Sequence, residues 1–160
     1  MGMGVIQSVI RFLGRICLSL IFIASGVYTL LNWQSSEQAL VGALCDWLSL
    51  ALGVEWAQKL CELGLSWSFF LLAASVICEI VGGLLVFLGL GVRLGALLLL
   101  LFMIPATVLF QHFWTFQGPE RELQMVMFLK NLSIIGGLLG LLAYDKGAKR
   151  SKVSKGAPEA

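Results

Sequence analysis

Four long apolar runs, separated by shorter polar segments, dominate the chain. They cover residues 9–31, 67–90, 94–113 and 125–144. Each is close to the ~20 residues that a helix needs to cross a hydrocarbon core of ~30 Å. The ~10-residue alternation of a membrane barrel is absent, and helices are the other structure that satisfies the backbone in lipid. The pattern therefore predicts an all-α integral membrane protein, a bundle of four transmembrane helices.

The segment between the first two runs, residues 34–66, is long enough to have structure of its own. Apolar positions recur there at helical spacing on either side of Gly53, with polar residues between them. They are Leu40, Leu44, Trp47, Leu48 and Ala51 before the glycine, and Val54, Ala57, Leu60, Cys61 and Leu65 after it. We expect a short amphipathic helical hairpin in this first external loop, lying on the membrane surface or capping the bundle.

Composition supports a membrane location and excludes other classes of protein. Of the 160 residues, 59% are hydrophobic and 12% are charged, against ~25% charged residues in soluble domains. With a mean hydropathy of +0.93, a soluble globule of this size could not bury its apolar surface. The net charge of +2, without a basic stretch interleaved with aromatic residues, excludes a nucleic-acid-binding protein.

Lysine and arginine residues are unevenly distributed, and this predicts the orientation. Only Lys59 and Arg121 lie on one side of the spans, apart from Lys130 near the start of the fourth. Eight lie on the other side: Arg11, Arg15, Arg93, Lys146, Lys149, Arg150, Lys152 and Lys155. The positive-inside rule then places both termini in the cytoplasm of a bacterial inner membrane. We expect a membrane domain over residues 1–145 and a disordered basic tail over 146–160, held near anionic headgroups.

The first apolar run could also be interpreted as a signal peptide. It is long for the apolar region of such a peptide, and no small-residue cleavage site follows it before Asn32. An uncleaved first span is therefore favoured.

The four cysteines contain no C-x-x-C pair, which argues against thioredoxin-like and zinc sites. Cys45 and Cys61 lie eight residues on either side of Gly53. A helical hairpin that turns at this glycine brings them to the same height, which allows a disulfide in an oxidising periplasm. The alternative is that both are small buried hydrophobic residues. Cys17 and Cys78 lie inside spans, where packing is the expected role.

Several polar side chains lie inside or at the edge of the apolar runs. Glu79 is near the middle of the second run, His112 near the end of the third, and Lys130 and Asn131 near the start of the fourth. At ~1.5 Å per residue, all four reach the outer half of one bundle. They either form a polar pocket that binds a quinone head or relays a proton, or have structural roles. In the second case Glu79 pairs with Lys130, or Lys130 extends to the headgroups, and His112 joins an aromatic belt.

Small residues mark two helix faces that we expect to pack inside the bundle. Ser75, Glu79, Gly82 and Gly83 share a face of the second span, and small residues allow close helix contact in lipid. Gly136 and Gly140 form a G-x-x-x-G strip on the fourth span.

Motifs for a resident cofactor are missing from the sequence. A single histidine excludes bis-histidine haem ligation within one chain. The chain has no P-loop, no dinucleotide-binding glycine motif and no metal-ligand cluster. Electron transfer would need another subunit or a bound quinone.

A series of short motifs carries a family resemblance. They are Arg15 followed by Phe22-Ile23-Ala24-Ser25-Gly26; Glu79-Ile80-Val81-Gly82-Gly83 followed by Gly89 and Arg93; Phe110-Gln111-His112-Phe113-Trp114; and Gln124 with Phe128-Leu129-Lys130-Asn131 and Gly136-Gly137-Leu138-Leu139. Up to about residue 144, the chain resembles the DoxX family of small four-helix bacterial membrane proteins. The resemblance implies that Gln124 belongs to the polar pocket and that Gly26 and Gly137 are packing positions.

The family's name comes from a component of thiosulfate:quinone oxidoreductase. The resemblance thus implies a subunit of a membrane-associated, quinone-linked oxidoreductase, with other membrane or periplasmic subunits or a second copy as partners. A small oligomeric transporter and a membrane assembly or scaffold protein are the alternatives. One four-helix bundle without an internal repeat is thin for a complete transport path.

Overall fold

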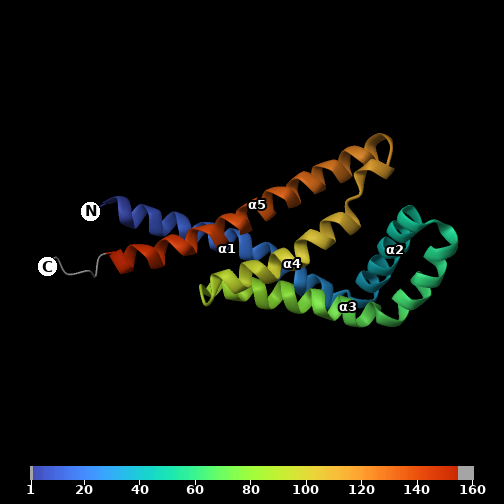
Figure 1. Cartoon of the computed structure of the whole chain (residues 1–160), viewed down its shortest axis with the longest axis horizontal. Helices are drawn as coiled ribbons and strands as arrows, with labels where there is room; N and C mark the ends of the chain where they lie inside the picture. The colour runs from blue at the N-terminus through green and yellow to red at the C-terminus, as the bar shows by residue number, and fades with distance from the viewer. Residues whose placement is uncertain (1, 155–160) are drawn as a thin grey trace.

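The computed structural model describes the backbone of residues 2–154 and the side chains of residues 5–53, 57–62 and 67–143. All regular structure in this part of the chain is helical (Figure 1). The elements are α1 (Gly2–Leu31), α2 (Trp33–Leu52), α3 (Val54–Leu88), α4 (Val92–Phe110), the 3₁₀ helix η1 (Phe113–Thr115) and α5 (Gly118–Ser154). Four segments are long and apolar enough to cross a membrane: Val5–Leu31, Trp67–Leu88, Val92–Thr115 and Gly118–Ala143. The prediction of an all-α protein with four spans is confirmed.

The helical hairpin between the first two spans differs from the prediction in one respect. Its first helix is α2, and the turn falls at Gly53, whose φ of 81° favours glycine. Its second helix, however, is continuous with the second span, so that α3 has 35 residues. Because no proline interrupts residues 54–88, the backbone hydrogen bonds can continue through the junction. At ~1.5 Å per residue α3 is about 52 Å long, and it bends near the end of the bundle (Figure 1).

Helix α5 also extends further than expected. It continues to Ser154, whereas the sequence pattern predicts the end of regular structure near residue 145. Lysine, arginine and alanine have good helix propensity, and basic residues are favoured near a helix C-terminus. These preferences explain the extension. Residues 155–160 lie outside the described residues, so a disordered tail stays a prediction there.

The spans form an arc in which each helix packs on the next. Helix α1 packs on α3, α3 on α4, and α4 on α5, while α2 lies along the first part of α3. Both termini are at one end of the bundle and α2 is at the other, called here the α2 end (Figure 1). Helices α1 and α5 touch only slightly and diverge toward the α2 end. The core residues are Phe22, Val86, Ala96, Leu99, Leu100, Met103 and Leu138.

Close helix crossings at glycine hold the arc together near the end with the termini. A Cβ on Gly95 would lie 2.8 Å from the backbone oxygen of Gly82, so α3 and α4 can approach only without side chains here. Gly83 similarly admits Ile23 of α1. The packing roles expected at Gly82 and Gly83 are therefore present in the structure, and Gly95 is an additional one.

The glycines of α1 and α5 divide into two groups. Gly26 packs against Ile80 of α3, and Gly137 against Leu18 of α1, as the resemblance implies. At Gly136 and Gly140, however, no atom of the residues that the structure describes lies within 4 Å of an added Cβ. Within the described part of the chain the G-x-x-x-G strip therefore has no helix packed on it, because α5 meets its neighbours through Gly137 and Leu138 instead.

Candidate ligand-binding cavity

A cavity of about 740 Å³ lies in the half of the bundle nearer the α2 end, and α1, α2, α3, α4 and α5 all contribute to its lining. Most of the lining side chains are apolar. The polar ones are Ser25, Tyr28, Thr29, Ser36, Ser75, Glu79, Gln111, Lys130 and Asn131. This volume falls in the ~300–1,000 Å³ range of small-molecule sites, which are usually apolar with a few placed polar groups.

Glu79 supplies a carboxyl group deep inside the span Trp67–Leu88. Its side chain is only 3% exposed, and the Ser25 side chain of α1 is its hydrogen-bonding partner. Gly26, next to this serine, lets α1 approach α3 closely, since a Cβ there would lie only 2.7 Å from Ile80 Cγ1, beside Glu79. The small residues of α1 thus bring a hydroxyl group to a carboxyl group that lipid alone could not satisfy.

Lys130 lines the same cavity, but it does not form the expected ion pair with Glu79. Its side chain is exposed, and its Nζ atom donates a hydrogen bond to Met127 Sδ at 3.4 Å. The reason lies in the helix arrangement, because α5 packs on α4 and the cavity separates it from α3. The ion pair with Glu79, one of the roles expected for Lys130 from the sequence, is therefore not formed, and Lys130 lines the cavity without it.

Asn131, the next residue, belongs to a buried polar cluster between α4 and α5. Its Nδ2 atom donates to Thr107 Oγ1 at 3.2 Å and to Gln111 Oε1 at 2.5 Å. Thr107 in turn donates to the Met103 carbonyl oxygen at 2.7 Å. Both hydrogens of the Asn131 amide are used in this cluster, which leaves the Gln111 NH₂ group as the donor that can serve a ligand.

Two residues expected in the pocket lie outside the cavity. His112 is 9% exposed, its Nδ1 atom is 3.0 Å from the Leu109 carbonyl oxygen, and its ring packs against Phe116. Gln124 is half-buried on α5 and does not line the cavity either. Helix α4 ends at Phe110, so the chain turns away before His112 can face the cavity.

The cavity includes polar residues that the sequence interpretation did not assign to a site. The sequence does not predict Ser25 or Gln111 as site residues, and it predicts Ser75 only as a small residue on a packing face. Helical spacing gives a weak signal for Gln111, which lies four residues after Thr107 on the same face as this buried hydroxyl group. Nothing in the sequence of α1 distinguishes Ser25 from the serine at position 19.

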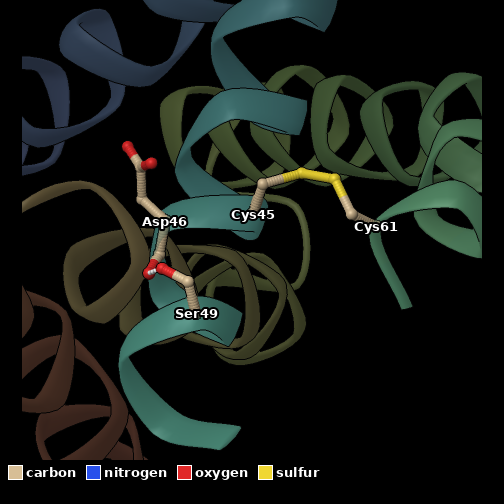
Figure 2. The surroundings of a disulfide bond; sticks show 4 residues. All are labelled: Cys45, Asp46, Ser49 and Cys61. Atoms are coloured by element: carbon tan, nitrogen blue, oxygen red, sulfur yellow. Dashed lines mark hydrogen bonds between the residues drawn. A yellow bond between two sulfur atoms is a disulfide. The ribbon is translucent and has the colours of Figure 1, made fainter. Parts of the chain in front are cut away.

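Helix α2 closes the end of the cavity through Ser36, Ala39, Leu40 and Leu44. The structure places Cys45 and Cys61 in a disulfide across the hairpin, with a Cα–Cα distance of 5.5 Å (Figure 2). Two further contacts hold α2 on α3. The Ser68 hydroxyl donates to Glu37 Oε1 at 2.6 Å, and the rings of Trp33 and Phe69 are 5.2 Å apart. The disulfide, the hydrogen bond and the ring contact therefore hold α2 over the cavity at three points along the helix.

Comparison with known proteins places the chain in a family. The DoxX family model matches residues 10–112. The chain is similar to the Escherichia coli (strain K12) "Inner membrane protein YphA", with 24% identity over 145 residues that cover 91% of this chain and 89% of that protein. No solved structure matches the chain at a significant level. Because the family match covers well over half of the chain and the structure has four candidate spans, this protein is an integral membrane protein of the DoxX family.

Proposed function

We propose that this chain is a subunit of a membrane-associated oxidoreductase and that its cavity holds the head of a quinone. The observation that carries the proposal is a buried carboxyl group, Glu79, facing a mostly apolar cavity at membrane depth. Intramembrane ionisable residues usually mark functional positions. The family resemblance supports the quinone-linked class of reaction, because the family takes its name from a component of such an enzyme.

The polar groups of the cavity fit a quinone head. Ser25 and Glu79 provide a hydroxyl and a carboxyl group on one wall, and Gln111 and Lys130 provide N–H donors on the other. A quinone accepts two electrons and two protons when it is reduced to a quinol, and its oxygens are hydrogen-bond acceptors or donors accordingly. The residues of this chain would bind and orient the head, while the apolar lining excludes water. The electrons would come from a partner subunit.

The E. coli relative's name and the Lys/Arg distribution support a place in the inner membrane with both termini in the cytoplasm. Reporter enzymes fused to the C-terminus and inserted within residues 40–60 should report opposite sides of the membrane. A periplasmic signal from the C-terminal fusion would contradict this orientation.

Purification in mild detergent tests the function. We expect wild-type protein to co-elute with a membrane quinone and with at least one redox protein, both detected by mass spectrometry. Glu79→Gln should lose the quinone and keep the protein partner. Glu120→Gln, at an exposed position outside the cavity, is the matched control and should keep both. Co-elution of neither quinone nor redox protein with the wild type would contradict the proposal.

A further inference from the structure

The cavity reaches the lipid-facing surface on two flanks that differ in chemistry. One flank lies between α1 and α5, where the exposed lining residues include Ser25, Tyr28 and Lys130. The exposed lining residues of the other flank are apolar: Leu71, Ala74, Leu101 and Pro105, from α3 and α4. Leu101 is 69% exposed although it lines the cavity, so the cavity is open beside it.

The helix geometry places Ala74 and Leu101 on the flank between α3 and α4. Ile80 of α3 packs on Gly26 of α1, and Ala74 is about 120° from Ile80 around the helix. On α4, Thr107 bonds to Asn131 of α5, and Leu101 is likewise about 120° from Thr107. Both residues therefore lie away from α1 and α5.

The opening between α3 and α4 also has a structural cause. The two helices cross closely at Gly82 and Gly95, nearer the end with the termini. Toward the α2 end the cavity lies between them, beside the small residue Ala74 and the proline at position 105. At that end the cavity is covered by α2, which packs on α3 and contacts α4. For a ligand with a long apolar chain, access from the α2 end is therefore blocked by α2, whereas the apolar opening between α3 and α4 is accessible from the side.

We propose that the ligand is an isoprenoid quinone that enters from the lipid, with its head at Ser25 and Glu79 and its tail leaving between α3 and α4 past Ala74 and Leu101. This inference rests on the proposed function and adds the route and the orientation of the ligand. The apolar flank solvates the tail, while the polar flank presents hydrogen-bonding groups to the head. A water-soluble solute would have to pass α2 to reach the cavity, so the geometry favours a lipid-soluble ligand.

Photolabelling of the full chain in phospholipid nanodiscs tests the inference. Two quinone probes are used, one with an azide on the ring and one with a diazirine at the end of the tail, and labelled peptides are mapped by mass spectrometry. Excess unlabelled quinone should suppress specific labelling by both. We expect the ring probe to label α1 and α3 near Glu79, and the tail probe to label the flank lined by Ala74 and Leu101.

Tryptophan substitutions at the flank provide matched variants on the same helices. Ala74→Trp or Leu101→Trp should lower competable labelling by roughly tenfold, the effect of ~1.4 kcal/mol. Ile77→Trp and Leu97→Trp are the controls, because these exposed residues do not line the cavity. Each variant is first shown to elute as a monodisperse protein with a wild-type melting temperature, and the two flank variants replace each other if one fails.

The outcomes separate the route from the function. The route is overturned if both flank variants keep competable ring labelling while Ile21→Trp on α1 or Ala39→Trp on α2 blocks it. In that case the quinone site itself is still supported. Tail crosslinks to a second copy of the chain overturn the route as well. No competable ring labelling in the wild type overturns the proposed function and, with it, this inference.

Discussion

At the scale of single residues, the cavity contains an acidic group and a basic group that do not pair with each other. Glu79 is buried beside a serine, and Lys130 is exposed beside a methionine thioether. The sequence places both groups at similar depth but cannot show that α5 leans on α4 and away from α3. The depth of the four polar residues could thus be predicted from helix rise, whereas their pairing depends on how the helices pack.

A double-mutant cycle on these two residues should show no coupling. Lys130→Met should change the free energy of unfolding by less than ~0.5 kcal/mol, because the side chain is exposed and without a carboxylate partner among the described residues. The losses from Glu79→Gln and Lys130→Met should add within about 0.5 kcal/mol in thermal unfolding in detergent. A coupling of ~3 kcal/mol would instead show the buried ion pair that the structure lacks.

Asn131 should matter for stability more than any other polar residue of α5 that the structure describes, since it joins α5 to α4 through two hydrogen bonds. Interhelical hydrogen bonds in membranes contribute ~0.6–1.7 kcal/mol each, so Asn131→Leu should cost about 1–2 kcal/mol. Ser133→Ala, an exposed position that bonds only within its own helix, is the matched control. Equal melting temperatures for the two variants would show that the cluster does not hold the helices together.

At the scale of helices, small residues set how closely the spans approach. The prediction of close packing on α3 succeeds because Gly82 and Gly83 share a face with Glu79, and periodicity alone reveals that face. The prediction of close packing fails for Gly136 and Gly140. A G-x-x-x-G strip shows that another helix can approach closely, but it does not show that a partner helix is present. The fusion of the second hairpin helix with the second span could not be read from the sequence either, since hydrophobic periodicity gives no sign of where a helix ends without a breaker.

The α3–α4 crossing gives a sharp test of this packing. Gly95→Ala places a Cβ 2.8 Å from a backbone oxygen, so the helices must move apart. We expect a loss of about 1–3 kcal/mol, typical of overpacking. Gly136→Ala adds the same methyl group in open space and should be neutral or stabilise by up to ~1 kcal/mol through helix propensity. The comparison fails to support the crossing if both variants unfold at the same temperature.

The disulfide should stabilise the hairpin that covers the cavity. Cys45 and Cys61 are separated by 16 residues, and closing a loop of this length contributes about 3 kcal/mol on the chain-entropy model. Cys45→Ser should therefore lower the melting temperature, and reductant should lower that of the wild type equally. Cys17→Ser, at an exposed free cysteine, should have no effect. Alkylation of both thiols in freshly prepared, unreduced protein would mean that the bridge does not form in the membrane.

At the scale of the whole molecule, one bundle forms a cavity with contributions from all five α-helices. Fold class and span number follow from the four apolar runs, and the candidate cavity does not, because its walls come from residues up to 113 positions apart that no local pattern connects. The helix rise per residue predicts that Glu79 and Lys130 lie at a similar depth in the membrane. Only the arrangement of the helices adds Ser25 and Gln111 and removes His112 and Gln124.

Direct binding of a quinone to purified protein in nanodiscs tests the cavity as the functional site. We expect saturable binding of one radiolabelled short-chain quinone per chain, unchanged in Glu120→Gln. In Glu79→Gln the dissociation constant should rise by up to roughly tenfold, because a weaker amide donor replaces the carboxyl group that donates to a quinone oxygen, and such a hydrogen bond contributes ~0.5–1.5 kcal/mol. Saturable binding of equal affinity in wild type and Glu79→Gln, or no saturable binding in the wild type, would contradict the assignment of this cavity as a quinone site.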